Sequence, residues 1–279
     1  MFTGIRCLLI TLAISLILPS MTQANEHHEG GDHDSQHDDE PFSLHFSHPL
    51  IAESPSPDTK ARFDYVYERI HEGIENARQH TLRFEGEYAF HPAFSVEIDA
   101  PFVFFDDDGA SSESNFGTTE IGFKVANFLL ADYGILLGYG LELGLPTGDE
   151  NKGIGSNNEL EIEPFFDVGL KCNDLELVGF ISFGIPTNHD KGEEVENEFG
   201  FNISSLYHFS SRFIGVLEID GETELNGHGE GHTVTNLTPG VKFQPFENTP
   251  LDIGVGVSVP LTGRENFEIR SIVSAFYHF

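Results

Sequence analysis

The sequence has no tryptophan, two methionines and two cysteines, and its 14 lysines and arginines face 46 aspartates and glutamates. The resulting formal net charge of −32 argues against nucleic acid as a partner, because its phosphates would be repelled. It also argues against a basic surface that docks on anionic lipid head groups. An acidic excess of this size suits a well-solvated surface or an interior that attracts cations.

Scarce cysteine and missing catalytic motifs exclude further classes of protein. Cys7 lies in the leader described below, so its removal leaves Cys172 as the one cysteine of the mature chain. A disulfide scaffold and a cysteine-based zinc site are therefore both excluded. The sequence contains no G-x-S-x-G elbow and no coherent set of catalytic side chains. We predict no enzymatic activity, no catalytic residue and no required cofactor.

A long apolar run occurs only at the N-terminus, where residues 1–24 are typical of a signal peptide. Arg6 supplies a positive start, residues 7–18 form an apolar core, and residues 22–24 offer a small-x-small cleavage site. An uncleaved anchor is the alternative, which the short core disfavours. No later stretch approaches the ~18 apolar residues of a membrane helix. We expect export, cleavage near Ala24, and a mature chain that is either soluble or a barrel.

Residues 25–59 lack the pattern of a folded domain. Residues 25–40 are low in complexity, rich in His, Asp and Glu, and have no apolar side chain to bury, which predicts disorder. Residues 41–59 contain four prolines and are typical of an extended linker. We therefore predict a disordered periplasmic tail and linker over 25–59.

From residue 60 onward, apolar and polar residues alternate with the period of two that half-buried strands show. Glycine (29) and phenylalanine (26) are both frequent, which fits crowded strands with apolar outer faces. The first strand could instead be helical as far as residue 77, and the pattern allows ten to fourteen strands. The predicted strands are 60–69, 80–90, 94–105, 118–129, 133–145, 158–171, 174–186, 196–208, 212–223, 232–245, 249–261 and 266–279.

The connections between these strands alternate between short and long. Short turns are expected near 91–93, 130–132, 172–173, 209–211 and 246–248. Longer polar loops are expected at 70–79, 106–117, 146–157, 187–195 and 224–231, and 262–265 is a short member of that set. Short turns at one end and long loops at the other are typical of bacterial outer-membrane barrels. The predicted fold is all-β, a transmembrane antiparallel β-barrel of about 12 strands over residues 60–279.

One face of each strand must be apolar if the barrel stands in lipid. The opposite face then lines the lumen, and acidic residues dominate it. Aromatic residues flank the short turns, as expected at a membrane interface. The predicted lumen residues are Arg83, Glu85, Glu97, Asp99, Glu120, Lys124, Glu142, Glu161, Glu163, Asp167, Lys171, Arg212, Glu218, Asp252 and Arg270.

The chain ends in V-S-A-F-Y-H-F, with Val273, Ala275, Tyr277 and Phe279 on one face of the last strand. This ending resembles the C-terminal signal of outer-membrane proteins that the barrel-assembly machinery reads. The segment G-L-E-L-G-L-P-T-G-D (140–149) is similar to a motif of an outer-membrane family named after the MetA pathway of phenol degradation. That resemblance implies an outer-membrane barrel that aids the uptake or efflux of small molecules, and it implies no catalytic residue.

Two groups of histidines are candidate metal ligands. The tail carries His27, His28, His33 and His37, followed by His45 and His48, among many carboxylates. The loop residues His228, Glu230 and His232 form a second group. Imidazole and carboxylate suit Zn, Ni, Co or Cu ions. In both groups the alternative is a solvated mobile segment without metal.

The sequence therefore predicts a channel or transport accessory in the outer membrane of a Gram-negative cell envelope. Its acidic lumen would favour cations or neutral polar solutes, and its tail would gather divalent metal. Expected partners are outer-membrane lipid, the barrel-assembly machinery and small solutes. Two alternatives remain: a non-conducting structural or binding barrel, and a soluble exported β protein that binds metal.

Overall fold

The computed structural model describes residues 42–72, 75–107, 112–187, 197–227, 230–262 and 267–279. These belong to one compact unit, Phe42–Phe279. The predicted signal peptide and the tail as far as residue 41 lie outside the described residues. Across the described ranges, no helix is long and apolar enough to cross a membrane.

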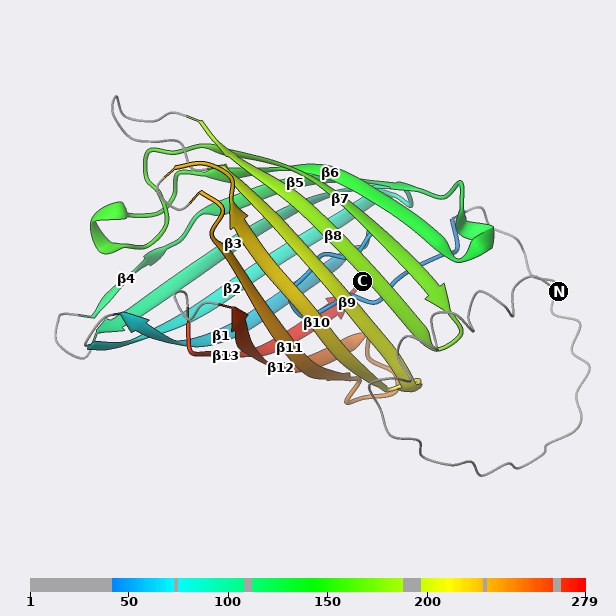
Figure 1. Cartoon of the computed structure of the whole chain (residues 1–279). Helices are drawn as coiled ribbons and strands as arrows, with labels where there is room; N and C mark the ends of the chain where they lie inside the picture. Colours follow the sequence, from blue (N-terminus) through cyan, green and yellow to red (C-terminus); the bar gives the residue numbers. More distant parts are fainter. Residues whose placement is uncertain (1–41, 73–74, 108–111, 188–196, 228–229, 263–266) are drawn as a thin grey trace, which may run out of the picture. The chain divides into compact units, whose positions relative to one another are not determined.

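Almost the whole unit is antiparallel β-sheet. Twelve strands close into a barrel because the first strand pairs with both the second and the last. Figure 1 shows these strands tilted around the barrel. The strands are β1 (Lys60–Glu72), β2 (Glu75–His91), β3 (Phe94–Asp107), β4 (Glu113–Phe116), β5 (Thr119–Asn127), β6 (Ile135–Leu145), β7 (Glu161–Cys172), β8 (Leu175–Pro186), β9 (Glu198–Ser210), β10 (Phe213–Glu224), β11 (Thr233–Phe243), β12 (Leu251–Thr262) and β13 (Ile269–His278).

The predicted barrel of about 12 strands is confirmed, and three local predictions need correction. Residues 60–72 form β1, which excludes the helical alternative. The long loop predicted at 70–79 is wrong, because β1 and β2 pair in register as far as Glu72 and Glu75. The loop at 106–117 contains β4, a short strand that pairs with β3 alone among the described strands and stands outside the closed ring. Short 3₁₀ helices follow β5 (η1, Ala131–Tyr133) and β6 (η2, Glu150–Lys152).

Exposure alternates along the strands as the pattern of two predicts. On β13, Val273 and Tyr277 are exposed on the outer face, whereas Ser274 and Phe276 are buried inside. Phe209 and Phe246, which flank two short turns, are also largely exposed. A continuous apolar exterior with polar residues inside is the arrangement that lipid requires of a barrel.

The motif at 140–149 has a structural role at the end of β6. Thr147 Oγ1 donates to Gly117 O at 2.7 Å and accepts from Thr119 N at 2.9 Å, which ties this end of β6 to the start of β5. A Cβ at Gly148 would lie 2.5 Å from backbone atoms of the 154–155 turn, so only glycine fits there. The motif therefore shapes the rim at the long-loop end.

The linker predicted as the last part of 25–59 is not an exposed chain. Residues 42–59, called the plug segment below, lie inside the barrel, where Leu50 and Ser54 are 1% and 0% exposed. Phe42 packs edge-on against Phe128 beside a short turn, and Thr59 O accepts from Phe279 N at 3.0 Å. Both ends of the plug segment are thus at the short-turn end. Its three prolines and its small residues suit a folded loop as well as a linker, and only the contacts with the barrel wall distinguish the two.

Candidate functional site: a lumen occupied by the plug segment

The tip of the plug segment is held by one carboxylate of the barrel wall. Glu218, on β10 and 0% exposed, accepts hydrogen bonds from three consecutive backbone N–H groups. Leu50 N lies 2.6 Å from Oε1, while Ile51 N and Ala52 N lie 3.3 Å and 3.2 Å from Oε2. Charge-assisted hydrogen bonds of this kind are the stronger ones in proteins. The tip is therefore fixed by its backbone rather than by its side chains.

Barrel cations bind the backbone carbonyls that lead to the tip. Arg62 Nη2 donates to Leu50 O at 2.5 Å, and Lys242 Nζ donates to His48 O at 2.7 Å. The two arms of the plug segment are also joined, since Ser56 Oγ accepts from Phe46 N at 2.9 Å. The plug segment thus satisfies its buried polar groups through side chains of the wall and of its own second arm.

Glycines on the inner face of the wall make room for the plug segment. A Cβ at Gly254 or Gly240 would lie 2.4 Å from a methyl group of Leu50. A Cβ at Gly169 would lie 2.6 Å from the ring of Phe46. Phe46 and Leu50 form a small apolar core with inward wall residues. The plug segment therefore fits against the wall because these glycines have no side chains.

A buried ion network surrounds the plug segment on the β1, β2 and β5 side. Lys60 Nζ lies 2.7 Å from both Glu85 and Glu87. Lys124 Nζ lies 3.0 Å from Glu53, the acidic residue of the plug tip. A buried ion pair that loses one partner leaves an uncompensated charge, which is strongly destabilising. These ion pairs therefore favour the one position of the plug segment in which each of these buried charges has its partner.

Two charged groups of the plug segment have shifted pKa values. Burial raises the pKa of Glu53, but the ammonium groups of Lys124 and Lys60 outweigh that effect and hold it well below its usual value. Burial lowers the pKa of His48 to about 4, and Lys60 acts in the same direction. At neutral pH, Glu53 is therefore ionised and His48 is uncharged.

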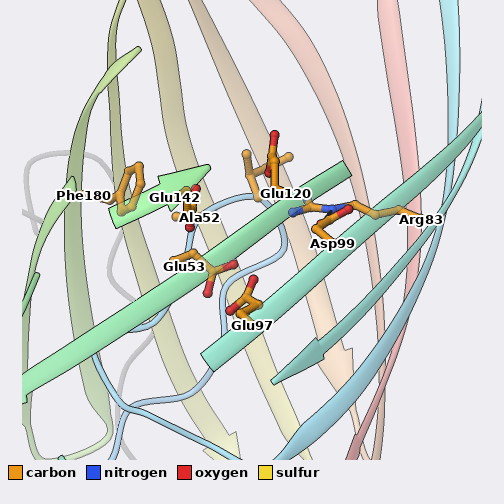
Figure 2. A pocket seen from close by; sticks show the side chains of 10 residues that line it. Ala52, Glu53, Arg83, Glu97, Asp99, Glu120, Glu142 and Phe180 are labelled. Atoms are coloured by element: carbon orange, nitrogen blue, oxygen red, sulfur yellow. Dashed lines mark hydrogen bonds and ion pairs between the residues drawn. The ribbon is translucent and has the colours of Figure 1, made fainter. Parts of the chain in front are cut away.

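Hollows adjoin the plug segment on two sides. One of 130 Å³ lies between the tip and the wall of β2, β3, β5 and β6. Figure 2 shows the carboxylates of Glu53 and Glu97 beside each other in it, with Arg83 reaching to Asp99. A second, of 250 Å³, shares Ile51, Ala52 and Phe180 with the first. A third, of 350 Å³, lies at the short-turn end beside His48 and His278.

The structure places the predicted lumen residues in six settings. Arg83, Glu97, Asp99, Glu120 and Glu142 line the first hollow, and Glu163 and Arg270 line the second. Lys171 and Asp252 line the third. Glu85, Lys124, Asp167 and Glu218 are buried, with exposures of 4% or less. Glu161 is half-buried beside Gly144 and Gly184, and Arg212 pairs with the exposed Glu247 at the short-turn rim.

The predicted metal ligands of the loop are not brought together in the described structure, and of the tail histidines only His45 and His48 lie within it. His27, His28, His33, His37 and His228 lie outside the described residues. Glu230 is exposed, and His232 Nδ1 lies 4.0 Å from Glu224. The ligand groups that gather closely among the described residues include neither of them. Metal binding by the tail and by this loop remains a prediction.

Sequence reasoning missed the residues that hold the plug segment, above all Lys60, Arg62, Leu50 and Ser56. A signal was present in the glycines that alternate with valine on β12. Glycines on a polar inner face leave space that another segment must fill. The apolar residues Phe46, Leu50 and Ile51, set among prolines, were the corresponding signal in the plug segment.

Comparison with protein families bears on this barrel as a whole. A family model described as "Putative MetA-pathway of phenol degradation" matches residues 63–272. The chain belongs to this family. The match runs from β1 into β13, so the family resemblance that the motif at 140–149 indicated is confirmed. A comparison with curated proteins gave no match.

Solved structures share the fold at low sequence identity. The COG4313 outer membrane channel from Pseudomonas putida F1 superposes with a TM-score of 0.62 at 11% identity, over 85% of this chain and 98% of that one. The NanC porin gives 0.54 at 9% identity, over 79% and 98%. The beta domain of the Bordetella autotransporter BrkA gives 0.51 at 11%, over 79% and 99%. These likenesses concern the fold alone.

Proposed function

We propose that the protein is an outer-membrane channel for small solutes, with an acidic lumen that favours cations and neutral polar solutes over anions. The observation that carries the proposal is the lining of the first hollow, where Glu97, Asp99, Glu120 and Glu142 face Arg83, the one cation among the described residues that line it. Rings of carboxylates select cations in channels. The fold shared with an outer membrane channel and with a porin supports the same function.

The difference in length between the turns and the loops indicates how the barrel is oriented in the membrane. In outer-membrane barrels the short turns face the periplasm and the long loops face outward. The plug segment then enters from the periplasm, the side on which we expect the His-rich tail after cleavage near Ala24. The exposed face of β13 with Val273, Ala275, Tyr277 and Phe279 would meet the barrel-assembly machinery. In this orientation the two acidic hollows would meet solutes before the plug segment does.

The proposal is tested by conductance in planar bilayers across a KCl gradient. Replacing Glu120, Glu142 and Glu163 by glutamine should lower the cation-to-anion permeability ratio by about twofold or more, because each replacement removes an ionisable carboxyl group from the lumen. Substitutions of three exposed charges at the short-turn rim serve as the matched control: Asp132→Asn, Asp174→Asn and Glu247→Gln. An unchanged reversal potential in the lumen variant would contradict the proposed selectivity.

A non-conducting barrel is the second candidate, and the buried contacts of the plug segment favour it. Glu218→Gln weakens those contacts without changing the size of the side chain. Under the channel proposal this variant should conduct more often than the wild type. Silence of both proteins in bilayers, with correct folding shown by a heat-dependent gel shift, would establish the non-conducting barrel instead.

A further inference from the structure

A set of ligand-bearing side chains lies at the short-turn end, where the plug segment meets the last strand. His48 Nε2 lies 3.3 Å from Asp58 Oδ2, and His278 Nδ1 lies 2.6 Å from the same oxygen. The three ligand atoms all lie within 4.8 Å of one another. Two imidazole nitrogens and a carboxylate oxygen are a donor set that suits Zn²⁺ and neighbouring divalent ions.

We propose that His48, Asp58 and His278 bind a divalent transition-metal ion that joins the plug segment to β13. Metal–ligand bonds of ~2.0–2.1 Å in a tetrahedral site place ligand atoms about 3.4 Å apart. The separation of His48 and Asp58 already matches this value, and Asp58 has to move only slightly away from His278. Two ligands come from the plug segment and one from the wall, so a bound ion would link them.

The surroundings of His278 favour a metal on its Nδ1 atom. Asp252 Oδ2 lies 3.9 Å from the other ring nitrogen, Nε2, on the far side of the ring. Metal-binding histidines commonly donate their second N–H to a carboxylate, which fixes the ring and raises its basicity. Asp252 is placed for that role after a small shift.

Lys60 is a neighbouring cation of the His48 ring, and its contacts allow a metal on His48 Nε2. Lys60 Nζ lies 3.3 Å from His48 Nδ1, but it also lies 2.7 Å from both Glu85 and Glu87. Metal at Nε2 moves the ring proton to Nδ1. The third ammonium proton then turns to Glu53, whose carboxylate lies 3.9 Å away. The charge of Lys60 thus stays balanced by carboxylates.

The cavity beside the three ligands gives access and a fourth position. Its volume is 350 Å³, and His45, Glu176 and His208 line it together with the three ligands. Water from this cavity can complete the coordination. By contrast, the close trio of Glu53, Glu87 and Glu97 surrounds Lys60 and Lys124 and is an ion-pair network.

The test measures zinc binding by the full chain in detergent by isothermal titration calorimetry. The protein used should first lose its other candidate histidine ligands through substitution by glutamine of His27, His28, His33, His37, His45, His228 and His232. In this background we expect one zinc ion per barrel. His278→Gln or Asp58→Asn should weaken binding by about tenfold or more. His208→Gln, which alters the same cavity outside the trio, should leave the affinity unchanged.

Backbone hydrogen exchange gives a local readout of the proposed link. Zinc should slow exchange of the amides at 44–58 in the background protein and should have no such effect with His278→Gln. No zinc binding in the background, or equal binding with and without His278 and Asp58, would overturn the site. Bound zinc without slower exchange would overturn the link. Neither measurement depends on conductance, so the channel proposal stands or fails separately.

Discussion

Two glycines on the inner face of the barrel wall leave the space that the plug segment occupies. Gly169 and Gly254 face inward, and a Cβ on either would lie within 2.6 Å of Phe46 or Leu50. Leu50 cannot move away easily, because its N–H and C=O are bonded to Glu218 and Arg62. At single positions, therefore, the absence of a methyl group decides whether the plug segment fits.

We expect Gly169→Ala and Gly254→Ala each to destabilise the seated plug segment by about 1–3 kcal/mol, the usual cost of overpacking. The measurement is hydrogen exchange of the amides at 44–53, which should become faster. Gly86→Ala is the matched control, since its Cβ would have no neighbour closer than 3.7 Å. Equal exchange rates in the three variants would show that the space beside Gly169 and Gly254 is not needed to hold the plug segment.

At the scale of elements, the plug segment behaves as a loop bonded through its backbone. Three successive N–H groups at its tip share Glu218, while Ser204 Oγ also donates to this carboxylate at 2.9 Å. Neutral glutamine offers one acceptor oxygen in place of two charged ones. The strands themselves do not depend on this contact, because each pairs with two neighbours around the ring.

Glu218→Gln should therefore release the plug segment by about 2 kcal/mol, in the range for hydrogen bonds to charged groups, and should leave the barrel folded. Faster exchange of the amides at 50–52 together with an unchanged heat-dependent gel shift would support this. Glu163→Gln is the control, because in the described structure Glu163 forms no hydrogen bond or ion pair with the plug segment. Exchange as slow as in the wild type would mean that the tip is held by something other than this carboxylate.

On the scale of the whole molecule, charge is unevenly distributed within the lumen. The cations Lys60, Lys124 and Lys242 are buried around the plug segment, whereas the first hollow holds several carboxylates beside Arg83. The net charge of −32 shows the acidic excess but not this separation. The plug segment is thus bound where the buried cations lie, among carboxylates such as Glu85, Glu87 and Glu218 that pair with those cations or with the segment itself.

Acid should loosen the plug segment through Glu53. Because its folded-state pKa is depressed, the ionised group stabilises the seated state above its ordinary pKa of 4.5, and this contribution is lost as the pH falls toward the folded value. We expect exchange of the amides at 44–58 to accelerate below about pH 4.5, after correction for the intrinsic rate. Glu53→Gln should give faster exchange at neutral pH and a weaker pH dependence. An identical pH profile in this variant would exclude Glu53 as the responsible group.

The sequence by itself determined the barrel, its strands and its two faces. Alternation over residues 60–279 is a local property, since successive side chains of a strand point to opposite faces whatever their partners are. Family membership followed equally from local residues such as those at 140–149. Only the tertiary structure decided where residues 42–59 lie and how His48 and Asp58 meet His278. The contacts with His278 join positions more than 200 residues apart. No local pattern shows which glycines of the wall will leave space for Leu50. A proline-rich segment is extended by its own chemistry, and it becomes a plug only when a closed wall supplies its hydrogen bonds.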